Sequence, residues 1–131
     1  MISFKEKKIL ITGASGAIGN DLVKKFVSLG GNVLGCGTKT EKLDMLKKAY
    51  PTIKVKKFDN SDHARIEEFI EDVALELGGL DILINNAGTN ADNLSLRMKY
   101  DEWKKVIDVN LTSTFLLSKY SIKKMLKSKY G

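Results

Sequence analysis

The fold of this chain is decided by the stretch Ile9-Leu10-Ile11-Thr12-Gly13-Ala14-Ser15-Gly16-Ala17-Ile18-Gly19. A compact apolar run enters a glycine-rich loop, and apolar side chains then recur at helical spacing as far as Leu29. This order of strand, loop and helix is typical of a parallel strand that leads into an anion-binding turn. Glycines let a diphosphate approach the backbone, and the start of the helix offers it free N–H groups. The spacing is neither G-x-G-x-x-G nor a P-loop, because no Gly-Lys-Ser/Thr follows.

Strand-like and helix-like segments alternate along the whole chain. Short apolar runs predict strands at 9–11, 33–34, 53–58 and 80–84. Helical spacing predicts helices at 18–29, 43–46, 66–77 and 101–128. Pro51 follows the second helix, and either Ser61 or Asp62 is expected to cap the third. The pattern predicts one α/β domain over residues 1–131, with a doubly wound parallel sheet that carries helices on both faces.

The composition excludes several classes of protein. Of the 131 residues, 43% are hydrophobic and 29% are charged, which is typical of one globular domain. No apolar run approaches the roughly 18 to 20 residues of a membrane helix, and the N-terminus lacks the apolar core of a signal peptide. The single cysteine, Cys36, can form neither an internal disulfide nor a C-x-x-C metal site, and we expect it to pack as a small apolar residue. These features predict a soluble cytoplasmic protein that binds neither a metal nor a membrane.

The positive charge is concentrated at the end of the chain. The net charge is +6, and residues 112–131 contain no acid but carry the lysines Lys119, Lys123, Lys124, Lys127 and Lys129. Such a run is either a solvated helix face or a docking patch for an acidic partner. Nucleic acid is disfavoured as that partner, because the run contains no arginine.

Two longer motifs resemble those of a known family, the short-chain dehydrogenases/reductases. Thr12 to Gly19 resembles the family's T-G-x-x-x-G-x-G loop, and Asn85-Asn86-Ala87-Gly88 resembles its N-N-A-G motif. Ala17 stands where the family has its middle glycine, and Gly16 lies one place earlier. Residues 90–113 are similar to the bacterial 3-oxoacyl-(acyl carrier protein) reductases within that family. The resemblance extends over essentially the whole chain. It implies a Rossmann-like doubly wound parallel sheet, truncated after four strands in the order 3-2-1-4.

The resemblance implies a cofactor site at the ends of the strands. It assigns to this site Gly13, Ser15, Gly16, Ala17, Ile18, Gly19, Asp59, Asn60, Asn86, Ala87 and Gly88. Asp59 would contact the adenine amino group, and the alternative is that Asp59 simply forms a turn. Asn86 has a structural role besides, since an asparagine amide can tie adjacent strand ends together.

The residues after the second strand favour NADP(H) as the cofactor. A sheet specific for NAD carries an acid there for the ribose hydroxyls, whereas this chain has none before Glu41. Lys39 can instead meet a 2′-phosphate, with Thr38 or Thr40 donating hydrogen bonds. The alternative is that Lys39 is a surface residue at a helix start and that the choice of cofactor is loose.

Of the family's catalytic residues, the resemblance identifies only Asn110, which would hold a water molecule in a proton relay. The alternative for Asn110 is an ordinary structural hydrogen bond. The family also needs a serine and then Y-x-x-x-K after a fifth strand. Tyr120 and Lys124 have that spacing, but no such strand lies between them and Asn110. We therefore expect the N-terminal half of a reductase, without turnover of its own and with an exposed apolar edge at 82–84.

The implied activity of the full-length parent is NADPH-dependent reduction of 3-oxoacyl-(acyl carrier protein) to the 3-hydroxyacyl form in fatty acid biosynthesis. The alternatives are another oxidoreductase of the family, acting on a sterol, sugar or polyol, or a non-catalytic nucleotide-binding or assembly module. The resemblance places the helix from Asn110 to Lys124 at the subunit contact of a homo-oligomer, a tetramer. It places Lys127 and Lys129 near the docking surface for acyl carrier protein.

Two single residues complete the predictions. His63 is expected to be a solvated residue in the first turn of a helix. Trp103 is expected to pack against the body of the protein rather than to contact a substrate.

Overall fold

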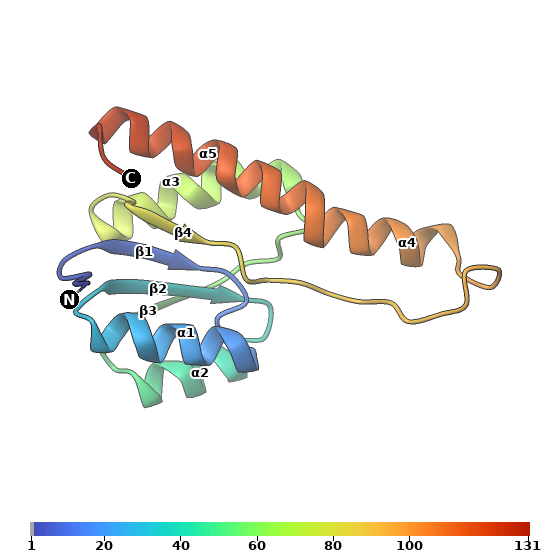
Figure 1. Ribbon diagram of the computed structural model, residues 1–131, viewed down its shortest axis with the longest axis horizontal. Coiled ribbons are helices and arrows are strands. Elements are labelled where there is room, and N and C mark those ends of the chain that lie inside the picture. Colours follow the sequence, from blue (N-terminus) through green and yellow to red (C-terminus); the bar gives the residue numbers. More distant parts are fainter. Residues whose placement is uncertain (1) are drawn as a thin grey trace.

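Parallel strands joined by helices form the frame of the molecule in the computed structural model, which describes residues 2–131 (Figure 1). The sheet has four strands in the order β3-β2-β1-β4, which confirms the predicted topology. The strands are β1 (Lys8–Ile11), β2 (Asn32–Gly37), β3 (Lys54–Lys57) and β4 (Ile82–Ile84). The helical elements are α1 (Ala17–Ser28), α2 (Thr40–Ala49), the 3₁₀ turn η1 (His63–Arg65), α3 (Ile66–Leu77), α4 (Tyr100–Ile107), the π-helical turn η2 (Asp108–Thr112) and α5 (Ser113–Ser128).

The central strand β1 separates two hydrophobic cores. It pairs in parallel with β2 on one side and with β4 on the other. Because successive side chains of a strand point to opposite faces, Leu10 packs with Ile70 of α3 and Leu117 of α5, whereas Ile9 and Ile11 pack toward α1 and α2. Figure 1 shows α1 and α2 on one face of the sheet and α3 and α5 on the other. The side chains of Ile9, Leu10 and Ile11 are fully buried, so β1 fixes the position of the turn that follows it.

The turn from β1 into α1 is so tight that two of its glycines cannot be replaced without moving the backbone. Gly13 has a φ of 61°, and a Cβ there would lie 2.8 Å from the Cα of Ala87. A Cβ at Gly19 would lie 2.1 Å from the carbonyl oxygen of Gly13 and 2.8 Å from backbone atoms of Ala14. At Gly16 the nearest atom would be 3.5 Å away, which is an ordinary contact. Gly13 and Gly19 are therefore required by the backbone itself, and Gly16 is not.

The start of α3 differs from the prediction. Neither Ser61 nor Asp62 caps a helix through its side chain, because the short turn η1 comes first. The Ser61 hydroxyl instead donates a hydrogen bond of 2.7 Å to the carboxylate of Asp59. The segment between β3 and α3 is thereby folded into a compact turn at the end of the sheet.

The long helical region begins and ends close to where the sequence predicts. α4, η2 and α5 follow one another without a break from Tyr100 to Ser128. Figure 1 shows α4 and the loop 85–99 projecting beyond the end of the sheet. Trp103 lies on this projection, is 51% exposed and stacks on Tyr100 with 6.1 Å between ring centroids. The prediction that Trp103 packs against the body is wrong, because α4 extends past the part of the molecule that could cover it.

At one edge of the sheet lies β4. Its side chains are half-buried rather than exposed, because Leu83 packs against one core and Ile82 and Ile84 against the other. Within residues 2–131 its outer side pairs with no strand, so the predicted exposed edge is a backbone edge. Among the same residues, no helix is long and apolar enough to cross a bilayer.

The tight turn gives a prediction for stability. Gly19→Ala forces a methyl group into backbone atoms, and we expect it to lower the free energy of unfolding by roughly 2 to 3 kcal/mol. Gly16→Ala is the matched control, and we expect it to change that free energy by less than about 1 kcal/mol. Urea unfolding of both variants measures the difference. Equal effects at the two positions would contradict the packing described above.

Candidate functional site

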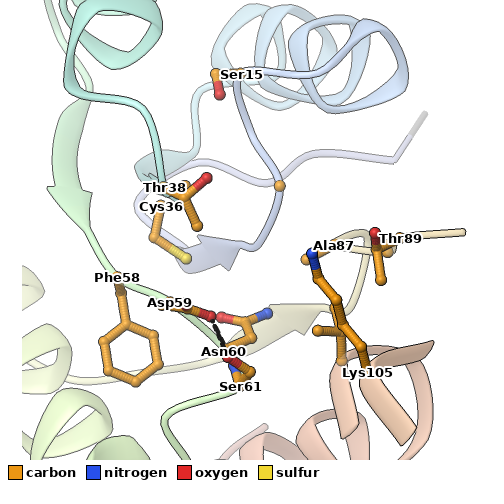
Figure 2. A pocket seen from close by; sticks show the side chains of 14 residues that line it. Ser15, Cys36, Thr38, Phe58, Asp59, Asn60, Ser61, Ala87, Thr89 and Lys105 are labelled. Carbon is orange, nitrogen blue, oxygen red and sulfur yellow. Dashed lines mark hydrogen bonds between the residues drawn. The ribbon is translucent and has the colours of Figure 1, made fainter. Parts of the chain in front are cut away.

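The loops that follow the strands meet at one end of the sheet, where the carboxyl ends of all four parallel strands lie. Two adjoining cavities open there. One, of about 470 Å³, is lined by the glycine-rich turn and is called the glycine cavity. The other, of about 410 Å³, is lined by the loop after β3 and is called the Asp59 cavity (Figure 2). Because residues of the β1 and β4 loops line both cavities, the two form a continuous site.

The loops after β1 and β4 are joined by Thr12 and Asn86. The hydroxyl of Thr12, a buried residue, accepts hydrogen bonds from the backbone N–H groups of Asn86 (3.1 Å) and Ala87 (3.0 Å). The side-chain amide of Asn86 donates to the carbonyl oxygens of Thr12 and Gly13, both at 3.1 Å. This confirms that Asn86 ties the strand ends together. Thr12 was named above only as the first residue of the glycine-rich motif, and its role in joining the two loops was not predicted. The signal for that role is a polar side chain directly after an apolar strand.

The glycine cavity collects most of the residues predicted to bind a cofactor. Its lining comprises Gly13, Ser15, Gly16, Ala17, Ile18, Gly19, Thr38, Lys39, Lys42, Asn86, Ala87 and Gly88. The start of α1 faces it, with no side-chain cap and no acidic residue in the first turn. Free N–H groups and the positive end of the helix dipole therefore meet two lysines, an arrangement that attracts phosphate. Lys42 was not predicted, because only the start of α2 brings it beside Lys39, whereas the predicted Thr40 lines neither cavity.

The Asp59 cavity lies beside the glycine cavity and shares with it residues of the loops after β1, β2 and β4. Figure 2 shows Phe58, Asp59, Asn60 and Ser61 of the loop after β3 along one wall, with Lys105 of α4 across from them. Phe58 is held by stacking on a phenylalanine of α3, with 4.0 Å between ring centroids. Asp59 and Asn60 were predicted for this site, whereas Lys105 was not, because sequence alone does not show that α4 reaches over the cavity.

The pKa values of two titratable groups in the Asp59 cavity are shifted in opposite directions. The hydroxyl and N–H of Ser61 donate to Asp59 at 2.7 Å and 2.9 Å and, with the charge of Lys105, hold the pKa of its carboxyl below the ordinary value. Asp59 is thus a carboxylate that can accept a hydrogen bond from an amino group. Burial raises the pKa of the Cys36 thiol to about 12, so Cys36 stays neutral, in keeping with its predicted apolar packing.

Asn110 pairs with the loop after β4. Its Oδ1 accepts the backbone N–H of Thr89 at 2.8 Å, and its Nδ2 donates to the Thr89 carbonyl oxygen at 2.7 Å. Thr89 lines the Asp59 cavity, whereas the side chain of Asn110 lines neither cavity. The observed contact is the structural hydrogen bond weighed above as the alternative, and a role in a proton relay stays a prediction.

The lysines near the C-terminus do not form one unbalanced patch. Lys123 forms an ion pair of 2.9 Å with Glu67 of α3, and Lys124 pairs with Glu71. The acids that balance these lysines lie about fifty residues earlier in the sequence, which the local charge count did not reveal. Tyr120 is half-buried against the core between α3 and the sheet, so the Tyr120 and Lys124 pair belongs to the packing of α5 on α3. Neither residue lines the cavities.

The shifted carboxyl of Asp59 gives a prediction for pH. Because its pKa in the folded chain lies below the ordinary 3.8, its contribution to stability is present above that pH and is lost as the pH falls through the folded value. We expect Ser61→Ala, which removes the largest cause of the shift, to raise the titration midpoint of the Asp59 carboxyl toward 3.8. Carbon-13 NMR of that carboxyl measures it. An unchanged midpoint would show that Ser61 is not the cause.

Comparisons with known proteins agree with the motifs at this site. The sequence model of the family described as short chain dehydrogenase matches residues 7–131. The 3-oxoacyl-[acyl-carrier-protein] reductase FabG of Salmonella typhimurium is 38% identical over 131 residues, which cover 99% of this chain and 54% of the relative. The enzyme of the same name from Rickettsia typhi is 37% identical, over 100% of this chain and 53% of its own length. The chain thus spans about half the length of these curated relatives.

Solved structures agree with the fold. A short-chain dehydrogenase from Streptomyces avermitilis superposes with a TM-score of 0.86 at 28% identity, over 95% of this chain and 47% of that protein. A short-chain dehydrogenase/reductase from Brucella melitensis, described as a glucose/ribitol dehydrogenase, gives a TM-score of 0.87 at 26% identity, over 94% of this chain and 53% of that protein. Sequence motifs, strand order and site therefore agree, and the chain belongs to the short chain dehydrogenase family.

Proposed function

We propose that this chain forms the cofactor-binding half of an NADPH-dependent reductase that converts 3-oxoacyl-(acyl carrier protein) to 3-hydroxyacyl-(acyl carrier protein). Membership of the family makes it part of an oxidoreductase. The observation that carries the proposal is the glycine cavity, where the uncapped start of α1 meets Lys39 and Lys42. The substrate is inferred from the named relatives, which align along this whole chain.

The residues at the sheet end fit a dinucleotide phosphate. Three glycines of the turn, Gly13, Gly16 and Gly19, line the cavity, so no side chain at these positions keeps a ligand from the backbone. The N–H groups at the start of α1 would bind the diphosphate, and Thr38, Lys39 and Lys42 the 2′-phosphate. When bound, NADPH would supply the hydride.

The Asp59 cavity suits the adenine end of the same cofactor. The Asp59 carboxylate would accept a hydrogen bond from the adenine amino group, because Ser61 and Lys105 keep it ionised. Phe58 and Asn60 would hold the ring beside it. The segment from Asn86 to Thr89 would form the wall that leads toward the reacting end, and its position is set by Thr12 and Asn110.

Proton transfer in this proposal needs groups that do not gather at the cavities among residues 2–131. Asn110, held on Thr89, retains a free lone pair on Oδ1 and would help to hold the water of a relay. The serine, tyrosine and lysine that the resemblance implies would act beside it in the whole protein. This division makes the chain described here a binding and orienting half.

Two surfaces would serve the whole protein's partners. The outer side of the long helix carries exposed apolar residues, Leu111, Phe115 and Ile122 (63%, 62% and 53% exposed), which would lie at the contact between subunits of a homo-oligomer. The exposed Lys127 and Lys129, which make no ion pair within the described chain, would attract the acidic acyl carrier protein.

Cofactor choice is tested at Lys39. We expect Lys39→Glu to weaken NADPH binding by roughly tenfold or more, because a carboxylate then faces the 2′-phosphate, and to leave NADH binding nearly unchanged. Fluorescence titration of the intact protein gives both dissociation constants. Lys48→Glu, in the last turn of α2 and outside both cavities, is the matched control and should change neither. Equal NADPH and NADH dissociation constants in the parent would rule out this assignment.

Docking is tested by charge reversal. We expect Lys127→Glu together with Lys129→Glu to raise KM for a carrier-bound 3-oxoacyl substrate by about fivefold or more at low ionic strength. KM for a small 3-oxoacyl thioester should not change. The control pair Lys24→Glu and Lys25→Glu places the same charge on α1. If carrier-bound and small substrates respond alike, the lysines do not dock the carrier.

A further inference from the structure

His63 is a half-buried, hydrogen-bonded link between two elements rather than the solvated residue that the sequence predicts. Its ring nitrogen Nε2 lies 3.0 Å from the carbonyl oxygen of Asp108 and 3.2 Å from the hydroxyl of Ser113. A carbonyl oxygen only accepts, so Nε2 carries a proton and donates. The prediction fails because η1, at the start of which His63 lies, packs beside η2, which comes about forty-five residues later in the chain.

The partner of His63 is the carbonyl that opens the π-helical turn η2. The Asp108 carbonyl oxygen accepts the N–H of Ser113, five residues on, where an α-helix would use the fourth. The Ser113 hydroxyl lies within hydrogen-bond distance of the same oxygen and of the Asn60 carbonyl oxygen at 2.5 Å. Donors from His63 and Ser113 therefore meet at a carbonyl whose bond to the fifth residue on belongs to the wide turn.

The wide turn sets the direction of Asn110, which lies inside it. In this geometry both polar atoms of the Asn110 side chain meet Thr89, at 2.8 Å and 2.7 Å. If the turn relaxed to an ordinary α-helix, residues before it would shift by one position relative to α5, a rotation of roughly 100° about the helix axis. Asn110 would then leave Thr89, and the loop along the Asp59 cavity would lose its support.

We propose that His63 is a positioning residue that keeps η2 in its π form and thereby aims Asn110 at Thr89. Asn60 and Ser113 complete the link, since the Ser113 hydroxyl can donate either to the Asn60 carbonyl at the cavity wall or to the Asp108 carbonyl. One consequence of this proposal, that His63 would support the reaction through Asn110, rests on the proposed function. The geometric claim stands independently of any activity.

The test compares two amide side chains of different reach. His63→Gln places a donor near the position of Nε2, whereas the shorter His63→Asn does not reach Asp108. Arg65→Asn, an exposed change in the same turn, is the control. Amide hydrogen exchange of Thr89, followed by NMR in the intact protein without added cofactor or substrate, reads out the contact with Asn110.

We expect His63→Asn to speed exchange at Thr89 by roughly tenfold, the worth of about one hydrogen bond, while His63→Gln and Arg65→Asn keep the parent rate within about threefold. The amide of Leu117 in α5 serves as the internal reference for global unfolding. Unchanged exchange at Thr89 in His63→Asn would overturn the proposal. So would an equal acceleration at Thr89 and Leu117, because His63 would then stabilise the fold without positioning Asn110.

The activity of the intact protein supplies a separate readout. If it reduces a 3-oxoacyl substrate, kcat should fall in His63→Asn and recover in His63→Gln, with the dissociation constant for NADPH unchanged. A protein without reductase activity would refute the proposed function, and the exchange result at Thr89 would still decide the role of His63.

Discussion

The contact between Gly19 and the carbonyl of Gly13 is the constraint on which the rest of the site depends. With only 2.1 Å between that oxygen and the place of a Cβ at position 19, α1 can start at this distance from β1 only if residue 19 is glycine. The close start of α1 turns its free N–H groups toward the ends of the strands. The pairing of β1 with β4 brings Gly13 against Ala87, so that Thr12 and Asn86 can join the two loops by short hydrogen bonds. The anion site and the wall beside it thus meet at the glycine-rich turn.

Most of the architecture could be predicted because it depends on local patterns. Compact apolar runs mark β1 and β4, helical spacing marks the helices, and glycine or proline punctuation marks where they stop. The residues of the glycine-rich loop that were predicted to bind a cofactor line one cavity because they are neighbours in the sequence. Asn86 was identified from its motif, and its hydrogen bonds follow from where β1 and β4 end.

The features that escaped prediction are those set by contacts between distant segments. Lys105 lines the Asp59 cavity, and His63 contacts η2, only because the helical segment from Tyr100 to Ser128 packs beside the loop after β3. The same folding places α5 on α3, so that Glu67 and Glu71 balance two lysines that look unpaired along the sequence. Trp103 was misplaced for the opposite reason, since α4 runs beyond the sheet and leaves the indole half exposed. The π-helical turn η2 was not predicted, and the carbonyl of Asp108 at its start contacts His63, a residue of another element.

The central claim is that the end of the sheet binds NADPH across both cavities. Titration of the nitrogen-15-labelled protein with NADPH, followed through backbone amide shifts, tests it most directly. We expect saturable shifts concentrated in 13–19, 38–42, 59–61 and 86–89, with NADH binding more weakly at the same residues. Saturation without shifts in these segments, shifts centred on α5, or no saturable change at all would contradict it.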